Sequence, residues 1–271
     1  MILKKMFWVL KRHPFLYTTR FKLLSKNVSV DDIGSCTYND TNKKEDISNY
    51  YSEINNTIFK DFTPQTDVLR VQNLSVWLQN NIKGGPGLSE PSDKALKIML
   101  AGKGGVCSDM AQVFNNFCVI NEIRVREWGT TRAPFNTAFG GHSFNEFFSK
   151  ELNKWILIDP SNSLFFYNSG EETPLSVVEL FQLIRKEKDI SYKSFNDKKK
   201  LEVKSIQRNY LNPNTIPFLI CNYSNKTYDK FLRHTRPYIP VFVTHFALYL
   251  LRKSYHYRFP LDDYKIIFSE D

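Results

Sequence analysis

The sequence contains little cysteine, with four residues among 271, and little glycine, with 11. The cysteines are Cys36, Cys107, Cys118 and Cys221. No two of them have the C-x-x-C spacing, and with the histidines they do not form the spacing of a zinc site. The even number would permit two disulfides. These absences argue against a metal-stabilised fold, and we expect no metal in this protein.

The chain also has no long hydrophobic run and no clear signal peptide. At the N-terminus, "MILKKMFWVLKRHPF" has its apolar residues interrupted by lysines and an arginine, without a cleavage site. The longest apolar stretch, Tyr238 to Leu251, is shorter than the roughly 20 residues that a membrane span requires. A buried helix is the favoured interpretation, with peripheral membrane contact left open. We expect a cytoplasmic protein with free thiols.

The charge is uneven and positive. The formal net charge is +9, and residues 1–30 contain seven basic side chains and no acidic one. A cationic segment with interleaved apolar residues is typical of segments that lie on anionic lipid. We therefore predict contact with an anionic surface, peripherally at the inner membrane. The chain has no helix-turn-helix, RNA-binding or phosphate-loop motif, so nucleic acid is not expected as a partner.

Hydrophobic residues make up 42% of the chain, which is typical of a folded globular protein. The pattern predicts three parts, namely a basic N-terminal arm and linker (1–45), a core (46–170), and a C-terminal extension that is mostly helical, basic and aromatic (171–271). Apolar residues recur at helical spacing over Val68 to Ile82. A shorter helix is expected after residue 91, capped by Ser92 or Asp93.

The stretch "GKGGVCSDMAQVF" places Cys107 behind a glycine pair, at the start of a helical pattern. The N–H groups at a helix N-terminus carry partial positive charge and lower the pKa of a thiol. The glycines would allow close approach of a substrate, and the Cys107 N–H could donate to an oxyanion. On position alone, however, a small buried residue is the more common interpretation of Cys107.

Two further residues could act with this cysteine. His142 follows a second glycine pair and begins an alternating strand, "HSFNEFF". Asp159 ends the apolar strand "KWILID", where a carboxylate is costly to bury unless another group pairs with it. The turn between these strands predicts a hairpin, which would bring His142 and Asp159 together. The alternatives are an ordinary buried or surface histidine, and an aspartate that begins a turn.

Taken together, "GGVCSDMAQVFNNFCVINEIRVREWG", "GHSFNEFF" and "KWILIDP" resemble the transglutaminase-like superfamily, a papain-like branch of cysteine enzymes, in its bacterial form. The matching positions are Cys107, Ile123, Arg126, Gly141, His142, Glu146, Trp155, Asp159 and Pro160. Two positions depart from the family pattern. Phe144 replaces a tryptophan, and a glycine is missing near Asn121, which we expect to take the left-handed conformation instead.

The resemblance implies an α+β fold in which the nucleophile helix packs on an antiparallel sheet, with helical extensions at both ends. It also implies that Cys107 is the nucleophile, His142 the base and Asp159 the residue that orients the imidazole. The reaction would be acyl transfer on a protein or peptide amide through a thioester, with no cofactor. Water as acceptor gives a peptidase or amidase, and an amine gives a transglutaminase. The alternatives are a non-catalytic scaffold and a membrane-associated factor that acts on cell-envelope material or polysaccharide.

Overall fold

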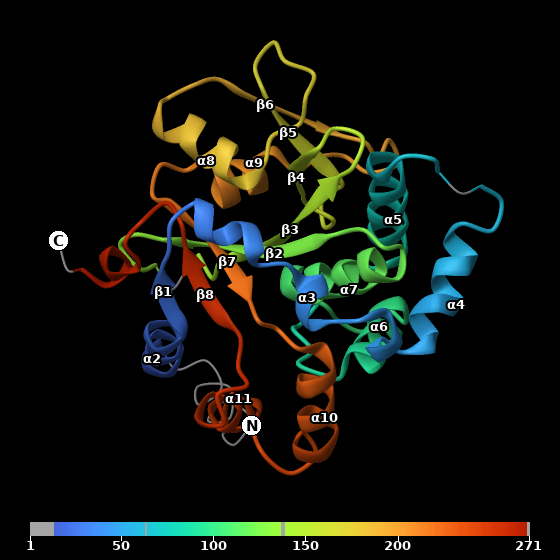
Figure 1. Ribbon diagram of the computed structural model, residues 1–271, viewed down its shortest axis with the longest axis vertical. Coiled ribbons are helices and arrows are strands. Elements are labelled where there is room, and N and C mark those ends of the chain that lie inside the picture. The colour runs from blue at the N-terminus through green and yellow to red at the C-terminus, as the bar shows by residue number, and fades with distance from the viewer. Residues whose placement is uncertain (1–13, 63, 137–138, 270–271) are drawn as a thin grey trace.

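The computed structural model describes residues 14–62, 64–136 and 139–269, and its centre is a six-stranded sheet (Figure 1). The strands lie in the order β1 (Ser25–Asn27), β8 (His256–Phe259), β7 (Thr215–Cys221), β2 (Val125–Arg132), β3 (His142–Ser149) and β4 (Lys154–Ile158). All neighbours are antiparallel except β1 and β8. A separate hairpin consists of β5 (Leu164–Asn168) and β6 (Ile190–Ser194).

Helices cover both faces of this sheet. The α-helices are α2 (Pro14–Leu24), α3 (Tyr38–Thr41), α4 (Asn49–Ile58), α5 (Asp67–Asn81), α6 (Ser92–Leu100), α7 (Cys107–Ile120), α8 (Val177–Arg185), α9 (Val203–Ile206), α10 (Asn225–Thr235) and α11 (Val241–Leu250). Short helical turns are η1 (Asp31–Ser35), η2 (Lys44–Asp46), the π-helical η3 (Gln207–Leu211) and η4 (Tyr264–Phe268). The mixed α+β class predicted from the sequence is confirmed.

The predicted nucleophile helix, α7, packs directly on β2 and β3 (Figure 1). Its inner side chains, including Phe114 and Phe117, are completely buried. Together with α4, α5 and α6 they form the core on one face of the sheet. On the opposite face, Trp128 and Phe144 meet the side chains of α8, α9 and β5 in a second core. The beginning of α7 is thus held firmly against β3.

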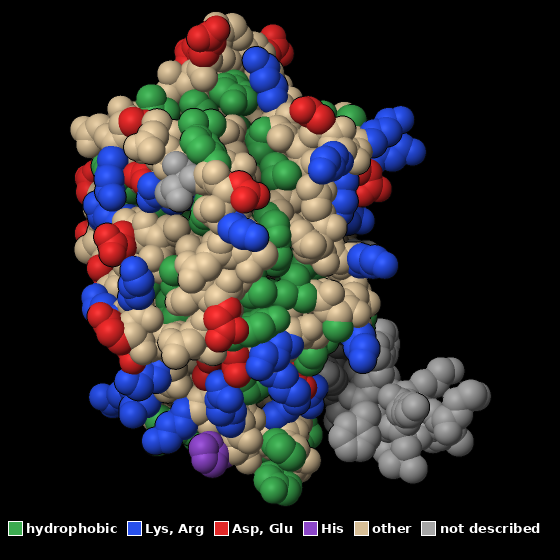
Figure 2. Space-filling view, turned by 90° about the vertical axis from the view of Figure 1, so that its right-hand side faces the viewer, with side chains coloured by type: hydrophobic (Ala, Val, Ile, Leu, Met, Phe, Trp, Pro, Cys, Tyr) green, Lys and Arg blue, Asp and Glu red, His purple; other side chains and the backbone are tan. Residues whose placement is uncertain are grey.

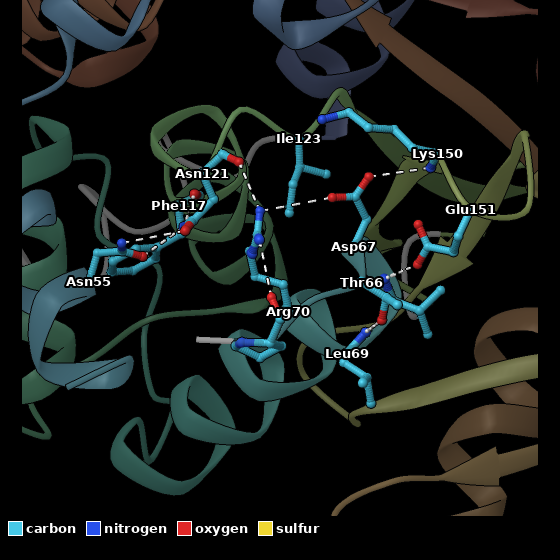
Figure 3. Close-up of polar contacts among 12 residues, drawn as sticks. Asn55, Thr66, Asp67, Leu69, Arg70, Phe117, Asn121, Ile123, Lys150 and Glu151 are labelled. Carbon is cyan, nitrogen blue, oxygen red and sulfur yellow. Dashed lines mark hydrogen bonds and ion pairs between the residues drawn. The ribbon is translucent and has the colours of Figure 1, made fainter. Parts of the chain in front are cut away.

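Polar contacts tie the start of α5 to the hairpin turn between β3 and β4 (Figure 3). The Thr66 hydroxyl caps α5 by accepting the Leu69 N–H at 3.2 Å. The Asp67 carboxylate accepts the backbone N–H of Lys150, and the Glu151 carboxylate accepts the backbone N–H of Val68 at 2.7 Å. These bonds fix the hairpin that carries His142 and Asp159 to the helical layer.

The predicted cap of α6 is wrong. Ser92 is the first helical residue, after Pro91, and its side chain does not cap the helix. Both the N–H and the hydroxyl of Ser92 instead donate to the Asp229 carboxylate, at 2.8 and 2.5 Å. A side chain of α10 therefore satisfies the N-terminus of α6, which a local sequence pattern could not indicate.

The left-handed residue after α7 is also different from the expectation. Asn121 has a φ of −87°, and its neighbour Glu122 has a φ of +58°. The Asn121 side-chain amide donates to the Phe117 carbonyl at 2.8 Å and to the Asn55 side chain at 2.7 Å. Because these bonds end the helix at Asn121, the chain reverses one residue later.

The C-terminal extension contains α8 to α11, and it also supplies the strands β6, β7 and β8. β7 lies between β2 and β8 at the centre of the large sheet. The partner strand β2 is more than 80 residues away in the sequence, so no hairpin pattern marks this pairing. The division of the chain at residues 45 and 170 stays a prediction.

In the described part of the chain, no helix has the length and apolar character needed to cross a membrane. The apolar stretch at 238–251 contains α11, a helix of ten residues. Of the basic N-terminal arm, residues 1–13 lie outside the described residues, and the rest forms α2 and β1.

Candidate active site

Cys107 is the first residue of α7, and its side chain is half-buried. The preceding residue, Val106, has an extended backbone and cannot cap the helix with its own side chain. Asp109, in the first turn, instead bonds back to the residues before the helix, because its carboxylate accepts the Val106 N–H at 2.9 Å and the Leu88 N–H at 3.2 Å. The sequence V-C-S-D therefore starts the helix at the cysteine.

The glycine pair before Cys107 has a packing role, and its role in substrate access stays a prediction. Gly104 and Gly105 are buried and have φ values of +156° and +114°. A Cβ on Gly104 would lie 2.6 Å from Leu88 Cδ2, and one on Gly105 would lie 2.9 Å from Met99 Cγ. No other residue type could bring the loop this close to the core while adopting these backbone angles.

His142 and Asp159 lie on adjacent antiparallel strands, as the hairpin pattern predicted. His142 begins β3, and Asp159 follows the last residue of β4. The His142 Nε2 atom is 2.9 Å from Asp159 Oδ2. Asp159 is inaccessible to solvent and His142 is buried. A carboxylate at this depth requires a charged or hydrogen-bonding partner, and the imidazole provides one.

The structure brings Cys107 to the same imidazole. The Cys107 thiol lies near the His142 side chain and the backbone N–H of Ser143, and both favour its ionised form. Because Asp159 occupies Nε2, the nitrogen left for the thiol is Nδ1. The start of α7, the start of β3 and the end of β4 therefore meet at one site. There the sulfur, the imidazole and the carboxylate lie in sequence.

The pKa values of the three groups shift as expected for such a chain. Burial opposes ionisation of Cys107, but the hydrogen bond and the charge of His142 outweigh it and lower the pKa of the thiol. Burial likewise disfavours the imidazolium, yet the Asp159 carboxylate raises the pKa of His142 to about 10. The Asp159 pKa is lowered because the His142 charge overcomes burial. The arrangement favours a thiolate–imidazolium pair at neutral pH.

Asp159 accepts further hydrogen bonds that the sequence interpretation missed. The Tyr210 hydroxyl donates to Oδ2 at 2.8 Å, and the Asn162 amide donates to the same oxygen at 2.7 Å. The Ser161 N–H donates to Oδ1 at 2.9 Å. The turn "DPSN" was a usable signal for Ser161 and Asn162. Tyr210 comes from η3 in the C-terminal extension, and no local pattern indicates its role.

Aromatic side chains enclose the imidazole. The Phe144 ring stacks on His142 with centroids 6.1 Å apart, and the Tyr210 ring meets His142 edge-on at 5.4 Å. Phe144 is fully buried and also contacts Tyr210. The phenylalanine that stands in place of the family tryptophan therefore still provides an aromatic wall behind the imidazole. This wall limits the access of water to the buried His142–Asp159 pair.

Two other family-matching residues support the strand that carries His142. Glu146 lies in β3 and is buried, and its carboxylate accepts from Arg126 at 3.3 Å and from the Trp128 indole at 3.1 Å. The other carboxylate oxygen accepts the Val177 N–H at the start of α8 at 2.9 Å. These contacts join β2, β3 and α8. Glu146 and Arg126 thus stabilise the sheet on the face opposite α7.

Within the described ranges, no three or more His, Cys, Asp and Glu side chains gather in a way that could hold a metal ion. The four cysteines are free thiols. Cys118 lies on the inner side of α7 and is completely buried, in agreement with the sequence interpretation.

The chain was compared with curated proteins, solved structures and family models. A search of curated proteins gave no significant match. Among solved structures, a candidate cysteine protease from Cytophaga hutchinsonii matches with 20% sequence identity and a TM-score of 0.32, over 42% of this chain and 39% of that chain. This chain therefore spans well under half the length of that protein. Residues 53–160, which contain α5 to β4 and all three site residues, match the family model of the transglutaminase-like superfamily. Over residues 53–160, this chain is therefore similar to the transglutaminase-like superfamily.

Proposed function

We propose that this protein is a cysteine enzyme that transfers the acyl group of a protein or peptide amide, with Cys107 as nucleophile, His142 as acid and base, and Asp159 as the residue that orients the imidazole. The observation that carries the proposal is the 2.9 Å contact between His142 Nε2 and Asp159 Oδ2, with the Cys107 thiol near the same imidazole. A helix-start cysteine and a buried carboxylate–imidazole pair meet the requirements of nucleophilic catalysis.

In this mechanism the Cys107 thiolate attacks the amide carbonyl carbon, and the carbonyl oxygen becomes an oxyanion. The N–H of Cys107, at the positive end of α7, is available to stabilise this charge. The His142 imidazolium then gives its proton to the amide nitrogen, the C–N bond breaks, and the amine leaves. A thioester on Cys107 and a neutral imidazole remain.

In the second half, the neutral His142 removes a proton from the acceptor, which attacks the thioester carbonyl. The C–S bond breaks, and the sulfur leaves as the thiolate beside a newly formed imidazolium. Asp159 stabilises that imidazolium throughout. Water as acceptor releases a free acid, and a primary amine yields a new amide.

The proposal is tested by labelling the full-length protein with a peptide vinyl sulfone, which captures an activated thiol without needing the natural substrate. We expect one label on Cys107, located by peptide mapping. Labelling should be lost in Cys107→Ala and retained in Cys118→Ala, whose thiol lies on the same helix but is buried. Labelling that spares Cys107, or that both variants retain equally, would support the scaffold alternative. Incubation of a library of glutamine-containing peptides with a biotinylated amine then separates the two reactions. Amine transfer attaches biotin to the peptide, and hydrolysis does not.

We also propose that the end of the molecule formed by α11 contacts an anionic membrane surface. Phe242, Phe246 and Leu250 follow each other at four-residue spacing on α11, and all three are exposed. Arg252 and Lys253, just after the helix, are exposed as well. Figure 2 shows Lys and Arg side chains gathered at the lower end of the molecule, the end at which α10 lies in Figure 1. Apolar side chains beside basic ones suit anionic lipid.

Co-sedimentation with phosphatidylcholine vesicles, with and without phosphatidylglycerol, tests this contact. We expect the protein to sediment with the anionic vesicles only, and the Phe246→Ser/Leu250→Ser variant to stay in the supernatant. Val203→Ser is the matched control, because Val203 is an exposed apolar residue on α9. Equal sedimentation of all three proteins would rule out α11 as the contact.

A further inference from the structure

Cys36 and Cys221 have no role in the proposed chemistry, yet the fold brings them together from parts of the chain that are 185 positions apart. Cys36 follows η1, and Cys221 is the last residue of β7. Cys36 is half-buried and packs against the core cluster that contains Cys221, which is 3% exposed. Both are free thiols.

The strand register places Cys221 beside Arg126. Glu127 of β2 pairs with Ile220 of the antiparallel strand β7. The next pair in this register is Arg126 opposite Cys221, whose side chains point to the same face of the sheet. The Arg126 guanidinium donates to the carbonyl of Gly34 at 3.4 Å. Because Gly34 lies only two residues before Cys36, this bond holds the Cys36 segment over Cys221.

The two thiols interact within this cluster, and two guanidinium groups act on them. The interaction with Cys221 lowers the pKa of Cys36 to about 7, against the effect of burial, and the charges of Arg258 and Arg126 lower it further. Asp40 acts in the opposite direction. The contact with Cys36, together with burial, raises the pKa of Cys221. One thiol is therefore set up to ionise first, beside a second thiol that can resolve it.

We infer that Cys36 and Cys221 form a reversible dithiol–disulfide site that low-molecular-weight disulfides, such as oxidised glutathione, oxidise. The Cys36 thiolate attacks one sulfur of the oxidant, whose S–S bond breaks and releases one thiol. Cys221 then loses its proton and attacks the Cys36 sulfur, expelling the second thiol. The net reaction converts two protein thiols and one small disulfide into one protein disulfide and two small thiols. The new bond would join the Gly34–Asn42 segment covalently to the central sheet.

The test uses the full-length Cys107→Ala/Cys118→Ala variant, which retains only Cys36 and Cys221. The native protein is incubated with oxidised glutathione, quenched with an alkylating agent and mapped by mass spectrometry. We expect a single linked pair of peptides containing Cys36 and Cys221, a protein mass lower by two hydrogens, and reversal by dithiothreitol. With Cys221→Ala added, Cys36 should accumulate as a mixed disulfide with glutathione, because no resolving thiol remains.

The rate of the first step provides a second measurement. Cys36 should react with oxidised glutathione at pH 7 roughly fivefold faster when Cys221 is present than in Cys221→Ala, because a larger thiolate fraction is only partly offset by lower intrinsic nucleophilicity. If both thiols of the native protein are alkylated after oxidant treatment, or if each carries its own glutathione, the inference is overturned. If the Cys107→Ala/Cys118→Ala variant does not fold, mapping of the wild-type chain gives the same distinction, since a Cys36–Cys221 linkage is then sought among four thiols.

Discussion

Asp159 is the residue on which the candidate site converges, because His142, Tyr210, Asn162 and Ser161 all donate to its two oxygens. Four donors stabilise the ionised carboxylate in a place that solvent does not reach. The His142 ring is fixed by the same carboxylate, and it must be correctly placed to serve the thiol. The precision of the site therefore depends on residues outside the family motifs.

Replacing Tyr210 by Phe tests this dependence. The variant keeps the aromatic ring against His142 but removes the hydroxyl that donates to Asp159 at 2.8 Å. We expect kcat/KM to fall by roughly tenfold, which corresponds to about 1.4 kcal/mol and matches a hydrogen bond to a charged group. The rate of acylation of Cys107 is the measurement, and Tyr192→Phe, in β6, is the control. Equal rates in Tyr210→Phe and wild type would remove Tyr210 from the site.

Glu127 makes a pH-dependent contribution to stability. Its carboxyl is buried against α7, accepts from Asn115 at 3.0 Å, and has its pKa raised by burial to about 8. Between the ordinary pKa of 4.5 and about 8, the unfolded chain releases this proton while the folded chain keeps it. The free energy of unfolding therefore falls as the pH rises through this window.

Glu127→Gln removes that loss while keeping the hydrogen bond from Asn115. We expect the variant to gain stability over wild type as the pH increases from 4.5 to 8, by on the order of 4 kcal/mol at the upper end. Urea unfolding at a series of pH values measures the difference. Parallel pH profiles of the two proteins would show that Glu127 is ionised in the folded state.

At the scale of elements, the sequence predicted α5, α7 and the β3–β4 hairpin well, because each has a periodic pattern and a local start or stop signal. The convergence of Cys107, His142 and Asp159 followed from these elements and from the family motifs. The pattern did not place the strands after residue 160 in the sheet. β7 is buried in a continuous apolar run and pairs with distant strands, so neither alternation nor a hairpin turn marks it.

The loop before α7 has a packing role that the sequence pattern did not indicate. Gly104 lies close to Leu88 and the Pro86 carbonyl, where a Cβ would not fit. Gly104→Ala should therefore destabilise the protein by about 2 kcal/mol through backbone strain and overpacking. Thermal unfolding measures this loss. Gly34→Ala is the matched control, since its added Cβ meets nothing within 4 Å, and an equal effect of the two changes would contradict the packing role.

At the scale of the whole molecule, the large sheet is assembled from both ends of the chain. The family-matched residues 53–160 supply β2, β3 and β4, and the flanking parts supply β1, β7 and β8. All eight residues of β2 are buried, and β7 pairs with it over six positions. The segments outside the family match therefore complete the sheet and also contribute Tyr210 to the site.

A fragment of residues 46–170 should consequently fail to fold by itself. Without β7, the central strand β2 would expose unpaired backbone groups and apolar side chains. We expect a collapsed or aggregated product without the sharp thermal transition of the full chain, as measured by circular dichroism and calorimetry. A cooperative, monomeric fragment would show that the core is an independent domain.

The most direct measurement of the central claim is the pH dependence of Cys107 alkylation by iodoacetamide, in wild type and in His142→Gln. The imidazolium of His142 lowers the pKa of Cys107 below its ordinary value of 9.0 and keeps its own charge up to a pKa of about 10. The account predicts that Cys107 in wild type reacts readily at pH 7, and that the rate profile of His142→Gln shifts upward toward or above pH 9. Coincident profiles for the two proteins would contradict activation of Cys107 by His142.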